Sequence, residues 1–186
     1  MIRIISGNYR GAVIKNPEFS VVRPMSSRCR EAIFSQLQFE IPNSKVLDLF
    51  AGTGAIGLEA TSRGAKKVIA TELNQKAYQN IVDFCKKYNI KNYQIFNKSA
   101  IFLINDLKNK KFDFIFLDPP HSEEEITKKC FWKIAENNLL AKNGLIIYKT
   151  NLGSKLIPDI FSIHQIKKYG KNSVFFLKYY SEGKNE

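Results

Sequence analysis

Apolar and polar positions are grouped along the chain in blocks that have the length of single strands and helices. From Lys45 onward, short apolar runs alternate with longer segments in which apolar residues recur every three or four positions. The first pattern is typical of buried strands, and the second is typical of helices with one apolar face. Their regular alternation predicts an α/β fold in which helices cover a mostly parallel sheet.

The block boundaries predict seven strands and five helices in this part of the chain. Strands are expected at 45–50, 67–72, 92–97, 112–118, 145–148, 161–168 and 174–179, and helices at 55–63, 75–88, 100–107, 122–137 and 154–160. Ser122 to Glu125 has the spacing of a capping box, which predicts where the fourth of these helices begins. The tight turn at Gly170 predicts an antiparallel last strand, because parallel neighbours need a long crossover.

The first 40 residues precede this alternation and are expected to form a small extension. Residues 2–15 have the pattern of a hairpin, and Ser26 or Ser27 can cap a helix that follows it. A segment this short cannot bury a core of its own. We therefore expect an extension over residues 1–40, a domain over residues 41–180 and a disordered tail over residues 181–186.

Length and composition narrow the class of protein. A chain of 186 residues has room for about one domain, and it contains neither a membrane-length apolar run nor a signal-peptide pattern at its start. The three cysteines, Cys29, Cys85 and Cys130, lie far apart and fit no zinc pattern. We expect a monomer in a reducing, cytoplasmic setting, with no metal and no membrane contact.

The net charge of +12 favours a polyanionic partner, and the placement of arginine strengthens this expectation. Only six of the 29 basic residues are arginine, and five of them lie within the first 30 positions: Arg3, Arg10, Arg23, Arg28 and Arg30. The planar arginine fork binds phosphate through two hydrogen bonds, which lysine cannot do. These five side chains are predicted to contact the phosphates of a nucleic acid. Salt bridges within a small N-terminal layer are the alternative, although only Glu18 and Glu31 lie nearby in the sequence.

The sharpest local pattern is a strand that ends in Asp48 and opens into a loop with glycines at positions 52, 54 and 57. Glycines let the backbone turn sharply and approach a ligand, and the helix that follows offers unpaired N–H groups. Glu72 ends the next strand, where a carboxylate suits the hydroxyls of a ribose. The pattern predicts a nucleotide-like cofactor at the carboxyl edge of the sheet.

A second pattern, Asp118-Pro119-Pro120-His121, ends the strand expected at 112–118. It lies at the same edge of the sheet as the glycine loop, where ligands of such folds bind. Two prolines remove two backbone donors and leave a stiff turn that presents carbonyl oxygens and one carboxylate. A surface that accepts hydrogen bonds and donates few suits the exocyclic amine of a nucleobase.

These motifs resemble those of a known family. The segment from Asp48 to Gly57 looks like the S-adenosylmethionine loop of class I methyltransferases, and Asp118 to His121 looks like the amino-methylase signature. The segments Arg3-Ile-Ile-Ser-Gly-Asn-Tyr-Arg-Gly11 and Arg23-Pro-Met-Ser-Ser-Arg-Cys-Arg-Glu-Ala-Ile-Phe34 are similar to the bacterial 16S ribosomal RNA guanine-N2 methyltransferase family, called RsmD. The resemblance runs from residue 2 to about residue 180.

The resemblance implies a Rossmann-like methyltransferase that carries a small N-terminal hairpin and helix and acts on 16S ribosomal RNA or an assembling small subunit. The implied catalytic residues are Asp118, Pro119, Pro120 and His121. The implied S-adenosylmethionine ligands are Asp48, Phe50, Ala51, Gly52, Thr53, Gly54, Glu72, Leu73, Ser99 and Ala100.

Two positions depart from the family pattern. Ser99 stands where relatives usually place an acid or an amide against the adenine, and it could equally cap a helix. His121 replaces an aromatic ring that stacks on the flipped base, and an imidazole can stack, titrate or face solvent. Two other functions stay open: a DNA amino-methylase acting on adenine or cytosine, and a non-catalytic RNA-binding or assembly protein with a methylase fold.

Overall fold

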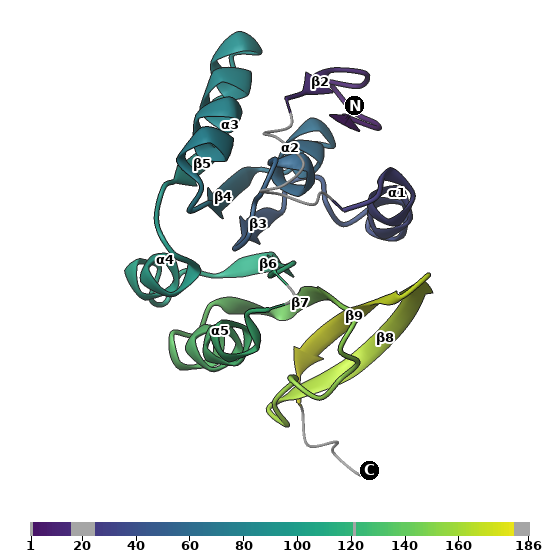
Figure 1. Cartoon of the computed structure of the whole chain (residues 1–186), viewed down its shortest axis with the longest axis vertical. Helices are drawn as coiled ribbons and strands as arrows, with labels where there is room; N and C mark the ends of the chain where they lie inside the picture. Colours follow the sequence, from purple (N-terminus) through teal and green to yellow (C-terminus); the bar gives the residue numbers. More distant parts are fainter. Residues whose placement is uncertain (1, 16–24, 121, 181–186) are drawn as a thin grey trace.

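Seven strands form one twisted sheet in the computed structural model, which describes residues 2–15, 25–120 and 122–180. The strand order is β5-β4-β3-β6-β7-β9-β8 (Figure 1). The strands are β3 (Lys45–Asp48), β4 (Lys67–Thr71), β5 (Tyr93–Phe96), β6 (Phe112–Leu117), β7 (Leu140–Thr150), β8 (Phe161–Tyr169) and β9 (Asn172–Tyr179). β3 to β7 are parallel, whereas β9 runs antiparallel to both β7 and β8. This confirms the expected sheet and its antiparallel last strand.

Helices cover both faces of the sheet, and each face has its own apolar core. α1 (Ser27–Gln36), α2 (Ala55–Ser62) and α3 (Gln75–Lys87) lie on one side, and α4 (Ala100–Asp106) and α5 (Glu124–Glu136) lie on the other (Figure 1). Successive strand residues point to opposite faces. Phe114 and Phe116 of β6 therefore belong to the first core, and Ile115 and Leu117 belong to the second.

The N-terminal segment packs onto the first of these cores. β1 (Ile2–Arg3) and β2 (Val13–Ile14) pair in antiparallel fashion, and Ser26 caps α1 by accepting a hydrogen bond from the Cys29 N–H. The expected hairpin and helix are thus confirmed. Ile4 of this segment is buried in the same cluster as Phe34 of α1 and Phe116 of β6.

Three expected boundaries are wrong, and each has a local cause. α5 begins at Glu124 without a side-chain cap, because the turn after Pro120 places the Glu123 N–H on the Pro120 carbonyl instead of forming the capping box. No helix forms over 154–160, where Pro158 lacks the donor that a helix needs and turns form in its place. β7 continues through Gly144, where a turn was expected, and a Cβ there would meet the Phe112 carbonyl oxygen at 2.9 Å.

Among the described residues, no helix is both long enough and apolar enough to cross a membrane. The same residues contain no cluster of metal-ligating side chains. Arg23, His121 and the tail over 181–186 lie outside the described residues, so the expectations for them stay predictions.

Candidate functional site

A cavity of about 870 Å³ opens at the carboxyl ends of the parallel strands. This volume lies within the range of small-molecule and cofactor sites. The cavity brings together ten of the residues singled out in the sequence: Phe50, Ala51, Gly52, Thr53, Glu72, Leu73, Ala100, Asp118, Pro119 and Pro120. The glycine loop and the Asp-Pro-Pro turn therefore share one space.

Asp48, which precedes the glycine loop, and Gly54, which belongs to it, do not line the cavity. Gly54 is the N-cap of α2 with a φ of 78°, and a Cβ there would meet the Ile81 side chain at 2.8 Å. The Asp48 carboxylate is 1 % exposed and accepts a hydrogen bond from the Gly57 N–H at 3.2 Å. Burial raises its pKa from 3.8 to about 7. Asp48 thus buttresses the loop and the start of α2.

Glu72 faces the cavity and is held there by backbone amides. Its carboxylate accepts hydrogen bonds from the N–H groups of Gly52 at 2.7 Å and Asn74 at 2.8 Å. Burial raises the pKa of Glu72, and these two hydrogen bonds oppose that effect. Each carboxylate oxygen has a further lone pair with which to accept a ligand hydroxyl.

Ser99 does not line the cavity, although Ala100 does. Its hydroxyl accepts a hydrogen bond from the Phe102 N–H at 3.4 Å and caps α4. Of the two roles considered for Ser99, the structure shows the helix cap.

The Asp118 carboxylate forms an ion pair that the sequence did not suggest. Lys149 Nζ lies 2.7 Å from Asp118 Oδ1, and the two side chains are only 13 % and 15 % exposed. Leu117 of β6 pairs with Tyr148 of β7, so the next residue of each strand emerges at the same place. Both side chains line the cavity.

The wall that faces the Asp-Pro-Pro turn comes from two segments far apart in the sequence. Met25, Ser26 and Cys29 contribute the start of α1, and Tyr169 and Asn172 contribute the turn between β8 and β9. Burial raises the pKa of the Cys29 thiol to about 11, so the thiol stays protonated at neutral pH. The other lining residues were also missed by sequence reasoning: Leu49, Ala55, Ile56, Thr71, Asn74, Lys98 and Glu123.

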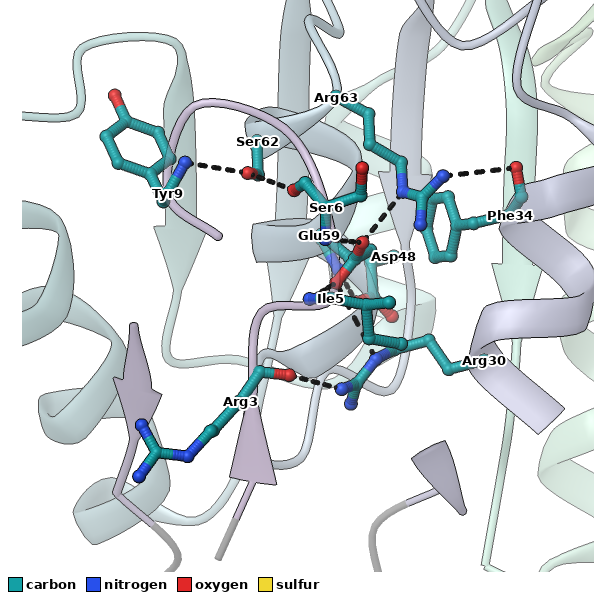
Figure 2. Close-up of polar contacts among 11 residues, drawn as sticks. Arg3, Ile5, Ser6, Tyr9, Arg30, Phe34, Asp48, Glu59, Ser62 and Arg63 are labelled. Atoms are coloured by element: carbon teal, nitrogen blue, oxygen red, sulfur yellow. Dashed lines mark hydrogen bonds and ion pairs between the residues drawn. The ribbon is translucent and has the colours of Figure 1, made fainter. Parts of the chain in front are cut away.

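Arg30 has a role different from the expected phosphate contact. Its side chain is 1 % exposed, its Nε lies 3.9 Å from Glu59 Oε2, and its Nη2 donates to the Arg3 carbonyl oxygen at 2.5 Å (Figure 2). Burial lowers the pKa of Arg30, and Glu59 opposes that shift. The expectation for Arg30 is corrected because a fully buried guanidinium group cannot reach a phosphate.

Glu59 is the centre of this buried cluster. It is 0 % exposed and accepts hydrogen bonds from Ile5 N–H at 2.7 Å, Ser6 N–H at 3.1 Å and Arg63 Nε at 2.7 Å (Figure 2). Two arginines and two backbone amides thus converge on one carboxylate.

Arg3, Arg10 and Arg28 are exposed, but only Arg28 lies on an element that lines the cavity. Arg10 follows Tyr9, whose ring contacts Tyr88 at the carboxyl end of α3. Asn74, at the opposite end of α3, lines the cavity. The Tyr9 N–H also donates to the Ser62 hydroxyl at the carboxyl end of α2, so Arg10 lies beside the ends of α2 and α3 that point away from the cavity.

Comparisons with known proteins agree with this architecture. A family described as "Conserved hypothetical protein 95" matches residues 2–178. The "Ribosomal RNA small subunit methyltransferase D" of Buchnera aphidicola is 32% identical over 89% of this chain and 87% of its own length. The structure of yhhF from Escherichia coli, with 28% sequence identity, superposes with a TM-score of 0.86 over 97% of this chain and 99% of that chain.

A more distant structure has the same fold. SMU.776, solved in complex with SAH, has 17% sequence identity and a TM-score of 0.59 over 77% of this chain and 48% of that chain. The family match spans nearly the whole chain, and the Buchnera aphidicola and Escherichia coli proteins are matched over most of their own length. The chain therefore belongs to the family described as "Conserved hypothetical protein 95", the RsmD family.

Proposed function

We propose that the chain transfers a methyl group from S-adenosylmethionine to the exocyclic N2 of a guanine in small-subunit ribosomal RNA. The observation that carries this proposal is the Asp118-Pro119-Pro120 turn, which lies in the same cavity as the glycine loop. The Buchnera aphidicola relative supports the choice of ribosomal RNA through its name.

The residues of the cavity suit S-adenosylmethionine. Glu72 offers carboxylate oxygens to the ribose hydroxyls, and Leu73 and Ala100 lie beside it on the same wall. Phe50 to Thr53 bring the backbone of the glycine loop to the methionine portion. SMU.776, which has the same fold, was solved with SAH, the demethylated product. When bound, the cofactor supplies an electrophilic methyl group.

The Asp-Pro-Pro turn would prepare the amine for attack. The guanine amine is a weak nucleophile because its lone pair is delocalised into the ring. Asp118 and the carbonyl oxygen of Pro119 can accept its two N–H groups and leave the lone pair directed at the methyl group. These hydrogen bonds strengthen as positive charge develops on nitrogen, so they lower the barrier rather than only bind the substrate.

Lys149 would hold the carboxylate in position for this role. Its ammonium group lies 2.7 Å from Oδ1 and stabilises the negative charge of Asp118 in a largely water-shielded place. Carboxylate oxygens have several lone pairs, so Asp118 can accept the amine while paired with Lys149. A base must leave its stack to reach this site, because the turn lies inside the cavity.

The proposal is tested by mass spectrometry of ribosomal RNA from cells with and without this protein. We expect one N2-methylguanine of the small-subunit RNA to be lost when the protein is absent. An unchanged RNA, or methylation confined to DNA, would contradict the proposal. Calorimetry provides a second test, since preferential binding of NAD over S-adenosylmethionine would also rule it out.

Asp118→Ala supplies the matching measurement on the protein. We expect turnover to fall at least ~100-fold, which is the usual scale for losing one contact to charge developing in the transition state. The affinity for S-adenosylmethionine should stay unchanged because the glycine loop and Glu72 are intact. Methyl transfer at the wild-type rate would exclude this role for Asp118.

A further inference from the structure

The β8–β9 hairpin ends at the mouth of the cavity. Tyr169 and Asn172, which flank its turn, line the cavity together with the first residues of α1. Figure 1 shows the end of this hairpin just below α1, and the side chains of Gln36 and Gln165 join the two elements further along. The hairpin turn and the start of α1 are therefore opposite sides of one opening.

Both sides of this opening carry cations that are not neutralised within the described part of the chain. Lys171 is exposed in the hairpin turn, and Lys167 is half-buried on the same face of β8 as Tyr169, because alternate strand residues share a face. Arg28 is exposed on α1 between Ser26 and Cys29, which line the cavity. No ion pair of these three side chains occurs among the described residues, although Glu31 lies one turn further along α1.

We propose that these three residues, here called the mouth rim (Arg28, Lys167 and Lys171), bind the RNA phosphates that flank the target nucleotide. The inference rests on the proposed function. A base that enters the cavity leaves its two phosphates outside, and these must lie near the opening. The mouth rim places cations from two elements around that opening.

The mouth rim lies on a different part of the surface from the N-terminal hairpin, where Arg3 and Arg10 were expected to contact RNA. Arg10 and Lys15 are exposed on the N-terminal hairpin, but Arg10 lies beside the carboxyl ends of α2 and α3, which are remote from the cavity. A phosphate next to a nucleotide in the active site cannot reach those helix ends. RNA that contacts Arg10 must be distant in space from the reacting base.

The test compares three double variants that each remove two positive charges from the surface. Lys167→Gln/Lys171→Gln alters the mouth rim, and Arg10→Gln/Lys15→Gln alters the N-terminal hairpin. Lys66→Gln/Lys67→Gln is the matched control, because both lysines are exposed at the amino end of β4, which is opposite to the cavity. Binding is measured by fluorescence anisotropy with protein-free small-subunit ribosomal RNA from cells that lack this protein.

Each phosphate contact adds about one to the slope of log affinity against log salt concentration. We expect the mouth-rim variant to lose about two from this slope and to bind RNA at least about tenfold more weakly at low salt. The Lys66/Lys67 control should keep most of its affinity. A mouth-rim variant that matches this control, or an N-terminal hairpin variant with the larger loss, would overturn the inference.

Two further measurements separate this inference from the proposed function. S-adenosylmethionine affinity and the turnover number at saturating RNA should be unchanged in the mouth-rim variant, while its KM for RNA rises. A wild-type protein that transfers no methyl group either to the protein-free RNA or to small ribosomal subunits from the same cells would refute the proposed function. An active wild type with an unchanged KM in the mouth-rim variant would refute the mouth rim alone.

Discussion

At the scale of single residues, the pairing of Asp118 with Lys149 determines how the candidate catalytic carboxylate is presented. We expect Lys149→Met to lower the turnover number by less than the ~100-fold expected for losing a direct contact, because Lys149 acts through Asp118. Lys149→Arg keeps the cation and should restore most of the rate. Steady-state kinetics with S-adenosylmethionine and RNA varied in turn provide the measurement. Equal rates for the Met and Arg variants would exclude the positioning role.

Asp48 gives the protein a specific dependence on pH. Its pKa of about 7 lies above its ordinary value of 3.8, so folding takes up a proton between these values and the free energy of unfolding falls as pH rises through the interval. Asp48→Asn removes this dependence. We expect the stability of the variant relative to wild type to increase by roughly 2 kcal/mol from pH 5 to pH 7.

Urea unfolding without cofactor at the two pH values provides the measurement. Asp83→Asn is the control, because Asp83 is exposed and the change is chemically the same. A parallel pH response in the two variants would show that burial of Asp48 does not govern its ionisation.

Residues that follow a strand at the carboxyl edge could be placed from the sequence, because strand ends meet at that edge whatever the details of packing. Phe50, Glu72 and Asp118 are examples. Lys149 follows the strand expected at 145–148, so the same rule could have placed it, whereas Tyr169 could not be placed because its position depends on how β8 pairs with β9. The sequence also did not show how deeply each residue is buried. Asp48 was expected to bind the cofactor, but it lies behind the glycine loop and does not line the cavity.

At the scale of elements, the N-terminal hairpin is fixed to α2 through a glycine. A Cβ on Gly7 would lie 1.9 Å from the Ser62 carbonyl oxygen, which itself accepts the Asn8 N–H at 2.8 Å. Gly11 has almost the same φ, 82° against 84°, but a Cβ there would meet no atom within 4 Å. Alanine substitutions at the two positions therefore distinguish the cost of a steric clash from the cost of the backbone conformation.

We therefore expect Gly11→Ala to lower the free energy of unfolding by about 1–2 kcal/mol, the cost of a left-handed conformation alone. Gly7→Ala should lower it by more, because the hairpin must also move away from α2. Denaturant unfolding measures both, and hydrogen exchange at Ile5 and Asn8 reports on the contact itself. Similar losses for both variants would show that the contact at Ser62 contributes little.

Elements with a strong periodic pattern were predicted within a few residues, as in α3 and β6. The predictions failed where a neighbouring strand or turn determines the local structure. Asn143 and Gly144 have turn chemistry, yet they stay in β7 because β6 pairs with that strand on both sides of a bulge. Ser122 has capping chemistry, but the preceding proline turn determines where α5 starts.

At the scale of the whole molecule, Glu59 connects three segments that are distant in the sequence: the chain after β1, α1 and α2. Removing one partner from a buried ionic cluster leaves the others unpaired in a dry environment. We expect Glu59→Ala to lower the free energy of unfolding by about 3–5 kcal/mol.

Glu136→Ala is the control for this change, because the pair that Glu136 forms with Lys133 is exposed and should contribute less than about 1 kcal/mol. Urea unfolding measures both variants. A Glu59→Ala variant as stable as the control would show that the cluster does not hold the N-terminal segment in place.

The alternation of apolar and polar blocks predicted the α/β architecture. It did not predict the contacts that connect the N-terminal segment, α1 and α2. Glu59 offered the one usable signal, since it is a lone acid in the apolar stretch Ala55-Ile-Gly-Leu-Glu-Ala60. Such a residue requires a partner when buried. Its partners lie 29 residues earlier and four residues later, and only the folded chain shows that Arg30 is one of them.

The position of β9 between β7 and β8 has a consequence for synthesis on the ribosome. β7 pairs with β9 and not with the strand that follows it in the chain, so its outer edge stays open until residues 172–179 have emerged. The same late segment completes the wall of the cavity through Asn172. Residues 172–179 must therefore have emerged before the cavity closes, and a nascent chain halted before residue 172 carries Asp118 and Lys149 without an enclosed site.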